Sequence, residues 1–175
     1  MIREANLTWQ YQDTESGLIM PCYTLPTLQW LKEQDTKKWC VFEFGAGYST
    51  IWWNLNSRFT YSVDDNATWA KAMDSVFREI QSEYVGAACE ALNDTNVDDD
   101  YYDCIVIDGK WRKECLKESI GWLVSGGYFI IDNWGQEDFP LSDCEFAEKL
   151  LEGWEKTIFS QPNHTTWKTA IFKKP

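Results

Sequence analysis

A two-glycine turn that follows the first strand-like run is the strongest chemical signal in this sequence. Glu43 lies near the end of that apolar run, and Gly45 and Gly47 follow it directly. Glycines allow a backbone to approach a ligand closely, because no side chain intervenes. A second strand-like run ends in Asp64, 21 residues after Glu43, the spacing at which α/β nucleotide folds place an acid on a ribose. Two ligand-facing turns at that separation predict an adenosine-containing cofactor.

The size and charge of the chain limit the classes of partner. Its 175 residues, 44% of them apolar and 16% aromatic, predict a single globular domain over residues 1–175. The formal net charge of -12 opposes binding to phosphate backbones and anionic lipids, since such binding depends on Lys and Arg. Neither a nucleic acid nor a membrane is therefore expected as a partner.

The cysteines and the N-terminus favour a reducing compartment. The six cysteines include no Cys-x-x-Cys pair, and a single histidine argues against a zinc site. Cys40 and Cys104 lie inside strand-like runs, and residues 1–6 show no basic region followed by an apolar stretch, so no signal peptide is expected. We predict a cytoplasmic protein with reduced thiols.

Strand-like runs alternate with helical patterns along the chain, which predicts an α/β, Rossmann-like fold with helices on both faces of a mostly parallel sheet. Seven strands are predicted, at residues 39–44, 59–63, 84–88, 103–107, 128–131, 156–160 and 166–172. Helices are predicted at residues 25–34, 49–56, 68–81, 112–124 and 142–151.

Short connections refine this topology. Only five residues separate the last two strands, too few for a parallel crossover, so these strands should form a C-terminal antiparallel hairpin. Residues 125–127, Ser-Gly-Gly, should end the fourth helix and turn the chain into the fifth strand. Ser142, with Glu145 three residues later, should cap the last helix.

From about residue 24 to residue 175, these features resemble the class I S-adenosylmethionine-dependent methyltransferases. Residues 43–50 are similar to the family's first motif in its Glu-x-Gly-x-Gly-x-Ser-Thr form. In the family that loop lies against the methionine portion of the cofactor, and the acid after the second strand binds the ribose hydroxyls. Two residues after the third strand fall where related enzymes contact adenine. The cofactor-binding residues that the resemblance implies are Glu43, Gly45, Gly47, Ser49, Asp64, Cys89 and Glu90, with Asp108 beside the cofactor.

A second block resembles small-molecule O-methyltransferases of the catechol type. Residues 102–109 and 126–133 are similar to the fourth and fifth strands of those enzymes, in which the corresponding Asp, Asp and Asn bind magnesium. The resemblance therefore implies Asp108, Asp132 and Asn133 as ligands of Mg²⁺, which would lower a substrate hydroxyl pKa. Asp132 and Asn133 could instead only cap the loop after their strand. Asp108 is expected to border the methyl-transfer pocket even without a metal.

The sequence departs from the catechol type at the catalytic base. Those enzymes carry a Lys three residues after the first metal-binding Asp, where this chain has Trp111. Lys110 and Arg112 flank it, and such charges are more often on the surface, but Lys110 is kept with Asp108 as a candidate catalytic residue. The pattern Asp-Gly-x-x-Arg-x-x-Cys is also similar to a group of poorly characterised small methyltransferases, for which no metal is implied. Trp111 and Trp134 could stack on an acceptor or pack in the core.

The function implied is methyl transfer from S-adenosylmethionine to an oxygen of a small molecule or sugar. A nicotinamide-dependent oxidoreductase shares the glycine turn, but its fingerprint requires a third glycine where this chain has Thr50. A non-catalytic cofactor-binding protein of the same fold is the third alternative. Residues 1–23 are expected to form a lid or substrate segment, over a pocket that is shallow or is completed by a second copy in a homo-oligomer.

Overall fold

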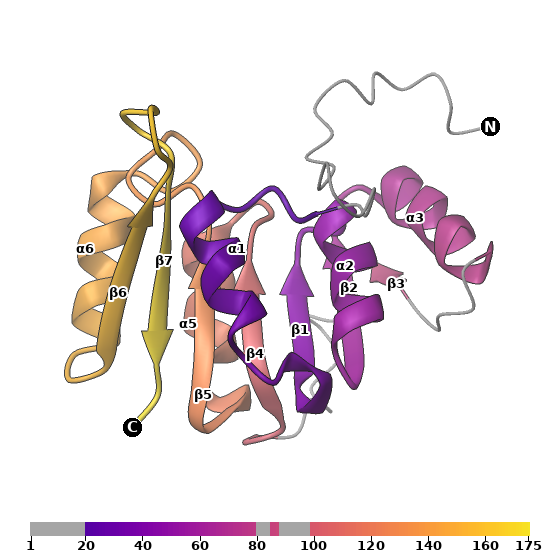
Figure 1. Cartoon of the computed structure of the whole chain (residues 1–175), viewed down its shortest axis with the longest axis horizontal. Helices are drawn as coiled ribbons and strands as arrows, with labels where there is room; N and C mark the ends of the chain where they lie inside the picture. The colour runs from indigo at the N-terminus through magenta and orange to yellow at the C-terminus, as the bar shows by residue number, and fades with distance from the viewer. Residues whose placement is uncertain (1–19, 80–84, 88–98) are drawn as a thin grey trace.

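The computed structural model describes residues 20–79, 85–87 and 99–175, and one mixed sheet runs through it (Figure 1). The strand order is β3-β2-β1-β4-β5-β7-β6. Neighbours from β3 to β5 are parallel, whereas β7 is antiparallel to both β5 and β6. The Rossmann-like α/β fold and the C-terminal hairpin are thereby confirmed. The strands are β1 (Cys40–Phe44), β2 (Phe59–Asp64), β3 (Val85–Ala87), β4 (Tyr102–Ile107), β5 (Leu123–Ile131), β6 (Glu155–Ser160) and β7 (Lys168–Lys173).

Helices cover both faces of this sheet because successive residues of each central strand point to opposite sides. On one face, Val41 and Val106 pack with side chains of α1 and α2. On the other face, Phe42 and Ile105 pack with side chains of α5 and α6. Figure 1 shows α1 in front of the sheet and α5 behind it. The helices are α1 (Leu25–Lys32), α2 (Tyr48–Asn56), α3 (Ala67–Glu79), α5 (Arg112–Ser119) and α6 (Leu141–Leu150).

The largest difference from the predicted elements is in β5. The fourth helix ends at Ser119 and a 3-10 turn follows, so β5 already begins at Leu123. The predicted turn at residues 125–127 lies inside this strand, because Gly126 N–H donates to Lys174 O and Lys174 N–H donates to Gly127 O, at 3.0 and 2.8 Å. The C-terminal residues thus hold in strand form a sequence that is locally typical of a turn.

Smaller differences occur elsewhere. The last helix begins at Leu141 with Pro140 as its N-cap and no side-chain cap, so the predicted cap at Ser142 is wrong. The predicted third strand reduces to β3, and its flanking residues lie outside the described part of the chain. No helix among the described residues is long and apolar enough to cross a lipid bilayer.

Candidate functional site

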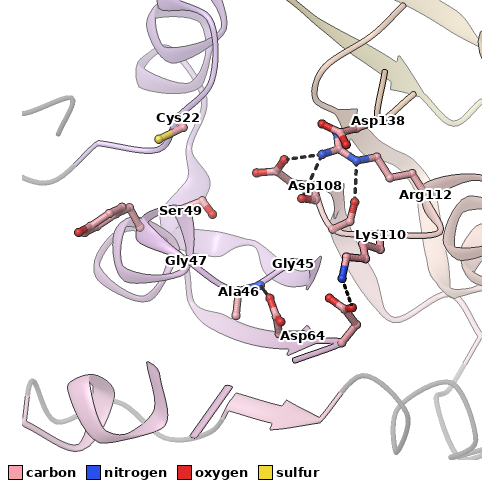
Figure 2. A pocket seen from close by; sticks show the side chains of 13 residues that line it. Cys22, Gly45, Ala46, Gly47, Ser49, Asp64, Asp108, Lys110, Arg112 and Asp138 are labelled. Carbon is pink, nitrogen blue, oxygen red and sulfur yellow. Dashed lines mark hydrogen bonds and ion pairs between the residues drawn. The ribbon is translucent and has the colours of Figure 1, made fainter. Parts of the chain in front are cut away.

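A cavity of about 400 Å³ opens at the carboxyl ends of β1, β2 and β4 (Figure 2). The chain crosses from β1 to β2 on one side and returns to β4 on the other, so the strand order reverses between β1 and β4. Open α/β sheets bind ligands at such a reversal, where the loops diverge. The cavity is lined by Cys22, Gly45, Ala46, Gly47, Tyr48, Ser49, Asp64, Asp65, Asp108, Gly109, Lys110, Arg112 and Asp138.

The two glycines of the turn after β1 have different tasks. Gly45 has φ +97°, and a Cβ there would lie 2.6 Å from Gly109 N and 2.7 Å from Asp108 O. Any other residue would therefore push apart the turns after β1 and β4. Gly47 lines the cavity in extended backbone, and a Cβ there would meet nothing within 4 Å. The protein's own packing does not require Gly47, whereas a ligand lying against the backbone would.

Glu43 stabilises the glycine turn through hydrogen bonds beneath it in the core. Its side chain is buried, and Oε2 accepts hydrogen bonds from Thr50 Oγ1 at 2.5 Å and Ser62 Oγ at 2.7 Å. Thr50 Oγ1 in turn accepts from Gly47 N–H at 2.8 Å. Burial raises the pKa of Glu43 to about 7, against the opposing effect of the neighbouring hydroxyls. Glu43 is absent from the cavity lining, so in this geometry it fixes the turn rather than facing a ligand.

Asp64, at the end of β2, lines the cavity beside the glycine turn. Its Oδ2 accepts from Ala46 N–H at 3.1 Å and its Oδ1 accepts from Asn66 N–H at 2.8 Å. Trp69 Nε1 donates to Ala46 O at 2.6 Å, so both peptide groups of Ala46 are held. A carboxylate oxygen has more than one lone pair, so Asp64 keeps acceptor capacity for hydroxyl groups of a ligand.

Arg112 joins the ends of β4 and β5. Its side chain is only 6% exposed, which corrects the expectation of a surface charge. Its Nε donates to Gly109 O at 2.7 Å and its Nη1 to Asp132 O at 2.7 Å. Its Nη2 lies 3.2 Å from Asp108 Oδ1 (Figure 2). One buried guanidinium therefore fixes the position of the Asp108 carboxylate at the cavity wall.

The two acidic residues at these strand ends resist ionisation. Burial and the neighbouring Asp132 carboxylate raise the pKa of Asp108 well above its usual range, while Arg112 opposes the shift. Burial raises the pKa of Asp132 to about 6, although a hydrogen bond from Thr169 Oγ1 at 2.6 Å favours its ionised form. Asp108 is thus a carboxyl group with raised proton affinity beside the cavity.

The residues predicted to bind magnesium do not fit a metal ion. Asp132 is only 3% exposed and its carboxylate is engaged by Thr169, whereas the Asp108 carboxylate is engaged by Arg112. Within the described ranges, no group of three or more His, Cys, Asp or Glu side chains is arranged to hold a metal. The magnesium prediction is therefore not supported, and Asn133 remains a loop residue with φ +53°.

Lys110 lines the cavity, but most of its side chain is exposed. Its Nζ lies 2.8 Å from Asp65 Oδ2, and 71% of its side chain is exposed. The Asp65 carboxylate raises the pKa of Lys110, so the ion pair keeps the lysine protonated. A protonated lysine cannot accept a proton, and the geometry gives no support to Lys110 as a general base.

The two tryptophans near the strand ends differ in burial. Trp134 is buried and stacks on Phe139 with ring centroids 5.3 Å apart, so it belongs to the core. Trp111 is 58% exposed at the N-cap of α5, with φ +50°. Cys89 and Glu90, predicted to contact adenine, lie outside the described residues.

The end of the predicted lid segment reaches the cavity. Cys22 is part of the lining, and its neighbour Tyr23 is fully buried, with its hydroxyl accepting from Trp53 Nε1 at 3.1 Å. Thr24 N–H donates to Thr169 Oγ1 at 3.3 Å, which links this segment to β7. Burial and the nearby carboxylates Asp108 and Asp132 raise the pKa of the Cys22 thiol.

No protein-family model matches this sequence, and a sequence comparison with curated proteins finds no match. Solved structures are similar in fold. A candidate caffeoyl-CoA O-methyltransferase from Staphylococcus aureus has a TM-score of 0.64 at 18% identity, over 89% of this chain and 86% of that chain. The tRNA (m1A58) methyltransferase TrmI from Aquifex aeolicus has a TM-score of 0.65 at 11% identity, over 85% and 67% of the two chains.

A third structure carries the cofactor. TYW2 of M. jannaschii, determined in complex with AdoMet, has a TM-score of 0.58 at 13% identity, over 87% of this chain and 77% of that chain. All three of these structures share the fold of this chain. The chain has the α/β fold of class I S-adenosylmethionine-dependent methyltransferases.

Proposed function

We propose that this protein is an S-adenosylmethionine-dependent methyltransferase that methylates an oxygen of a small molecule or a sugar. The observation that carries the proposal is the cavity between the ends of β1 and β4. Gly47 and Asp64 both line it, and no atom of the described residues occupies the space beside the Gly47 backbone. A carboxylate can accept from both ribose hydroxyls at once, and a glycine backbone can approach the methionine portion. The AdoMet complex of a protein with the same fold supports this choice of cofactor.

The proposed chemistry is an in-line displacement at the sulfonium. The acceptor oxygen forms a bond to the methyl carbon as the carbon–sulfur bond breaks, and the electron pair of that bond stays on sulfur. Asp108, in its ionised form, takes the hydroxyl proton of the acceptor, and its raised pKa increases its strength as a base. Arg112 opposes the raised pKa of Asp108 and fixes the direction of its carboxyl group, so that positioning contributes to the rate.

Calorimetry tests the cofactor assignment. We expect S-adenosylmethionine and S-adenosylhomocysteine to bind the purified protein, and the Asp64→Asn variant to bind each about 10- to 100-fold more weakly, as for the loss of a charged hydrogen-bond acceptor. Asn keeps one acceptor for Ala46 N–H, so the turn should survive the change. Glu137→Gln, the same loss of charge at an exposed residue outside the lining, is the matched control. No binding of either ligand to the wild type would remove the basis of the proposal.

Two further measurements separate the alternative functions. A nicotinamide-dependent oxidoreductase should change NADH fluorescence on mixing, and we expect no change. A non-catalytic cofactor-binding protein should release no S-adenosylhomocysteine with any acceptor, whereas a methyltransferase should release one equivalent for each methyl group transferred.

A further inference from the structure

More carboxylates than cationic side chains line the cavity, and this excess of negative charge favours some kinds of acceptor over others. Four carboxylates and two cationic side chains line it. Both cations already have a carboxylate partner within the lining, Lys110 with Asp65 at 2.8 Å and Arg112 with Asp108 at 3.2 Å. Asp64 is the carboxylate assigned to the cofactor ribose. No cation of the lining is therefore left to pair with an anionic acceptor, and desolvating an unpaired anion there would be costly.

Asp138 is the remaining carboxylate, and it lies at the end of the cavity away from Asp64 (Figure 2). Figure 2 shows it beside Arg112 and Asp108, across the cavity from Cys22 and Ser49. Through its charge, Asp138 adds a small contribution to the raised pKa of Asp108. Its side chain has no hydrogen bond or ion pair with any of the residues that the structure describes.

The loop that carries Asp138 is anchored on both sides of it. Gly135 N–H donates to Phe139 O at 2.9 Å, and Phe139 N–H donates to Gln136 O at 3.1 Å. Phe139 is fully buried and stacks on Trp134. A short hydrogen-bonded turn with a buried aromatic anchor thus carries, at the cavity, an exposed carboxylate that has no partner among the described residues.

We propose that the acceptor carries a positively charged amine in addition to the hydroxyl that is methylated, with Asp138 as the residue that recognises the ammonium. This inference rests on the proposed function and specifies the substrate class of the same site. An ammonium group would meet the unpaired carboxylate, while Asp108 would face the hydroxyl. The net charge of -12 also draws small cations toward the molecule and repels phosphate-bearing acceptors. Asp138 is a specificity residue in this scheme, and Asp108 retains the proton transfer.

A comparison of two cofactor analogues tests the charge preference without a known acceptor. Sinefungin carries an amine where S-adenosylmethionine carries the transferred methyl group, whereas S-adenosylhomocysteine is uncharged there. We expect calorimetry at low salt to show sinefungin binding several-fold more tightly, and Asp138→Asn to reduce that ratio by about threefold, as for a solvent-accessible ion pair. Glu137→Gln, the same charge change on the neighbouring exposed residue outside the lining, should leave the ratio unchanged.

The outcomes distinguish this inference from the proposed function. If both analogues bind and their ratio is the same in the wild type and in Asp138→Asn, the inference is overturned and the proposed function stands. If neither analogue binds, the proposed function fails and the inference falls with it. A reduced ratio in Asp138→Asn alone supports the inference.

A matched set of sugars gives a second, kinetic test. Glucosamine, glucose and glucuronate share a ring and hydroxyls but differ in charge, and the formation of S-adenosylhomocysteine reports their methylation. We expect kcat/KM to fall in that order, Asp138→Asn to raise KM for glucosamine with little change in kcat, and Asp138→Lys to favour glucuronate. Preferred turnover of glucuronate by the wild type would overturn the inference. The analogue comparison decides the question even if none of the three sugars is turned over.

Discussion

Two glycines separated by one residue differ in what they do for the protein and for its ligand. Gly45 is required by the fold, because its φ of +97° and the backbone of Asp108 and Gly109 leave no room for a side chain. Gly47 has neither constraint, and a side chain there would extend into the cavity. The same residue type in one motif therefore serves stability at one position and binding at the other.

Alanine substitutions separate these two roles. Gly45→Ala should lower the free energy of unfolding by roughly 3 kcal/mol, since it combines a left-handed backbone with a contact far below van der Waals distance. Gly47→Ala should change stability by less than about 1 kcal/mol but weaken S-adenosylhomocysteine binding about tenfold or more. Urea unfolding and calorimetry measure the two effects. Equal binding by Gly47→Ala and the wild type would contradict a ligand lying against this turn.

The sequence reveals some of these site residues and hides others for a physical reason. Gly45, Gly47 and Asp64 are visible because their roles depend on local chain geometry and a fixed distance along one crossover. Arg112 and Asp138 are not visible in this way. The burial of Arg112, and the absence of a partner for Asp138 among the described residues, depend on which strand ends meet in space. The arginine in the pattern Asp-Gly-x-x-Arg at the end of β4 is a local hint of the buried ion pair.

At the scale of elements, Arg112 links the carboxyl ends of β4 and β5, which are paired in the sheet and share a core cluster. Removing its side chain leaves the Asp108 carboxyl and the carbonyl groups of Gly109 and Asp132 without their donor. Arg112→Ala should therefore cost about 3 to 5 kcal/mol of unfolding free energy, as when one partner of a buried ion pair is removed.

Two further variants serve as comparisons for Arg112→Ala. Arg112→Lys should recover only part of the loss, because a lysine cannot reproduce the planar set of donors. Lys110→Ala, which removes the exposed partner of Asp65, should leave the unfolding free energy nearly unchanged. Urea unfolding curves for the three variants measure the order. A loss in Lys110→Ala as large as that in Arg112→Ala would show that the guanidinium does not hold the strand ends together.

The predicted elements agree with the structure where the local sequence pattern determines the element. They disagree where pairing with a distant segment determines it. The central strands and their crossover helices follow from apolar runs and turn residues, and β1 is buried along its whole length as expected of a central parallel strand. The start of β5 fails because Ser125, Gly126 and Gly127 have a turn composition that only the C-terminal residues override. Pairing with residues about 50 positions away leaves no trace in a local window.

For the whole molecule, the charge balance gives two expectations that act in the same direction. The chain has a formal net charge of -12 and a sequence pI of about 4.5, so mutual repulsion of its carboxylates decreases as the pH falls toward the pI. Two buried carboxyl groups, Glu43 and Asp132, have pKa values raised to about 7 and about 6. Both features predict a protein that is more stable in mildly acidic solution than at neutral pH.

The direction of the pH dependence follows from the difference in proton binding between the folded and unfolded chain. Between about pH 4.5 and pH 7, Glu43 ionises in the unfolded chain but stays protonated in the folded one, so stability falls as the pH rises through this window. The raised pKa of Asp132 adds a loss between about pH 4 and pH 6. For Glu43 alone the loss is on the order of 3 kcal/mol. Unfolding free energies from urea titrations at pH 5, 6, 7 and 8 should decrease from pH 5 to pH 7 and level off toward pH 8.

Glu43→Gln isolates the contribution of one carboxyl group to this trend. The amide oxygen can accept from Thr50 and Ser62 as Oε2 does now, while the amide nitrogen takes the place of Oε1, which has no hydrogen-bond partner among the described residues. The variant should lose most of the pH dependence between pH 5 and pH 7, whereas Glu137→Gln should keep it. A wild-type stability that increases with pH over this range would contradict the raised pKa of Glu43. It would also mean that Glu43 holds the glycine turn as a carboxylate.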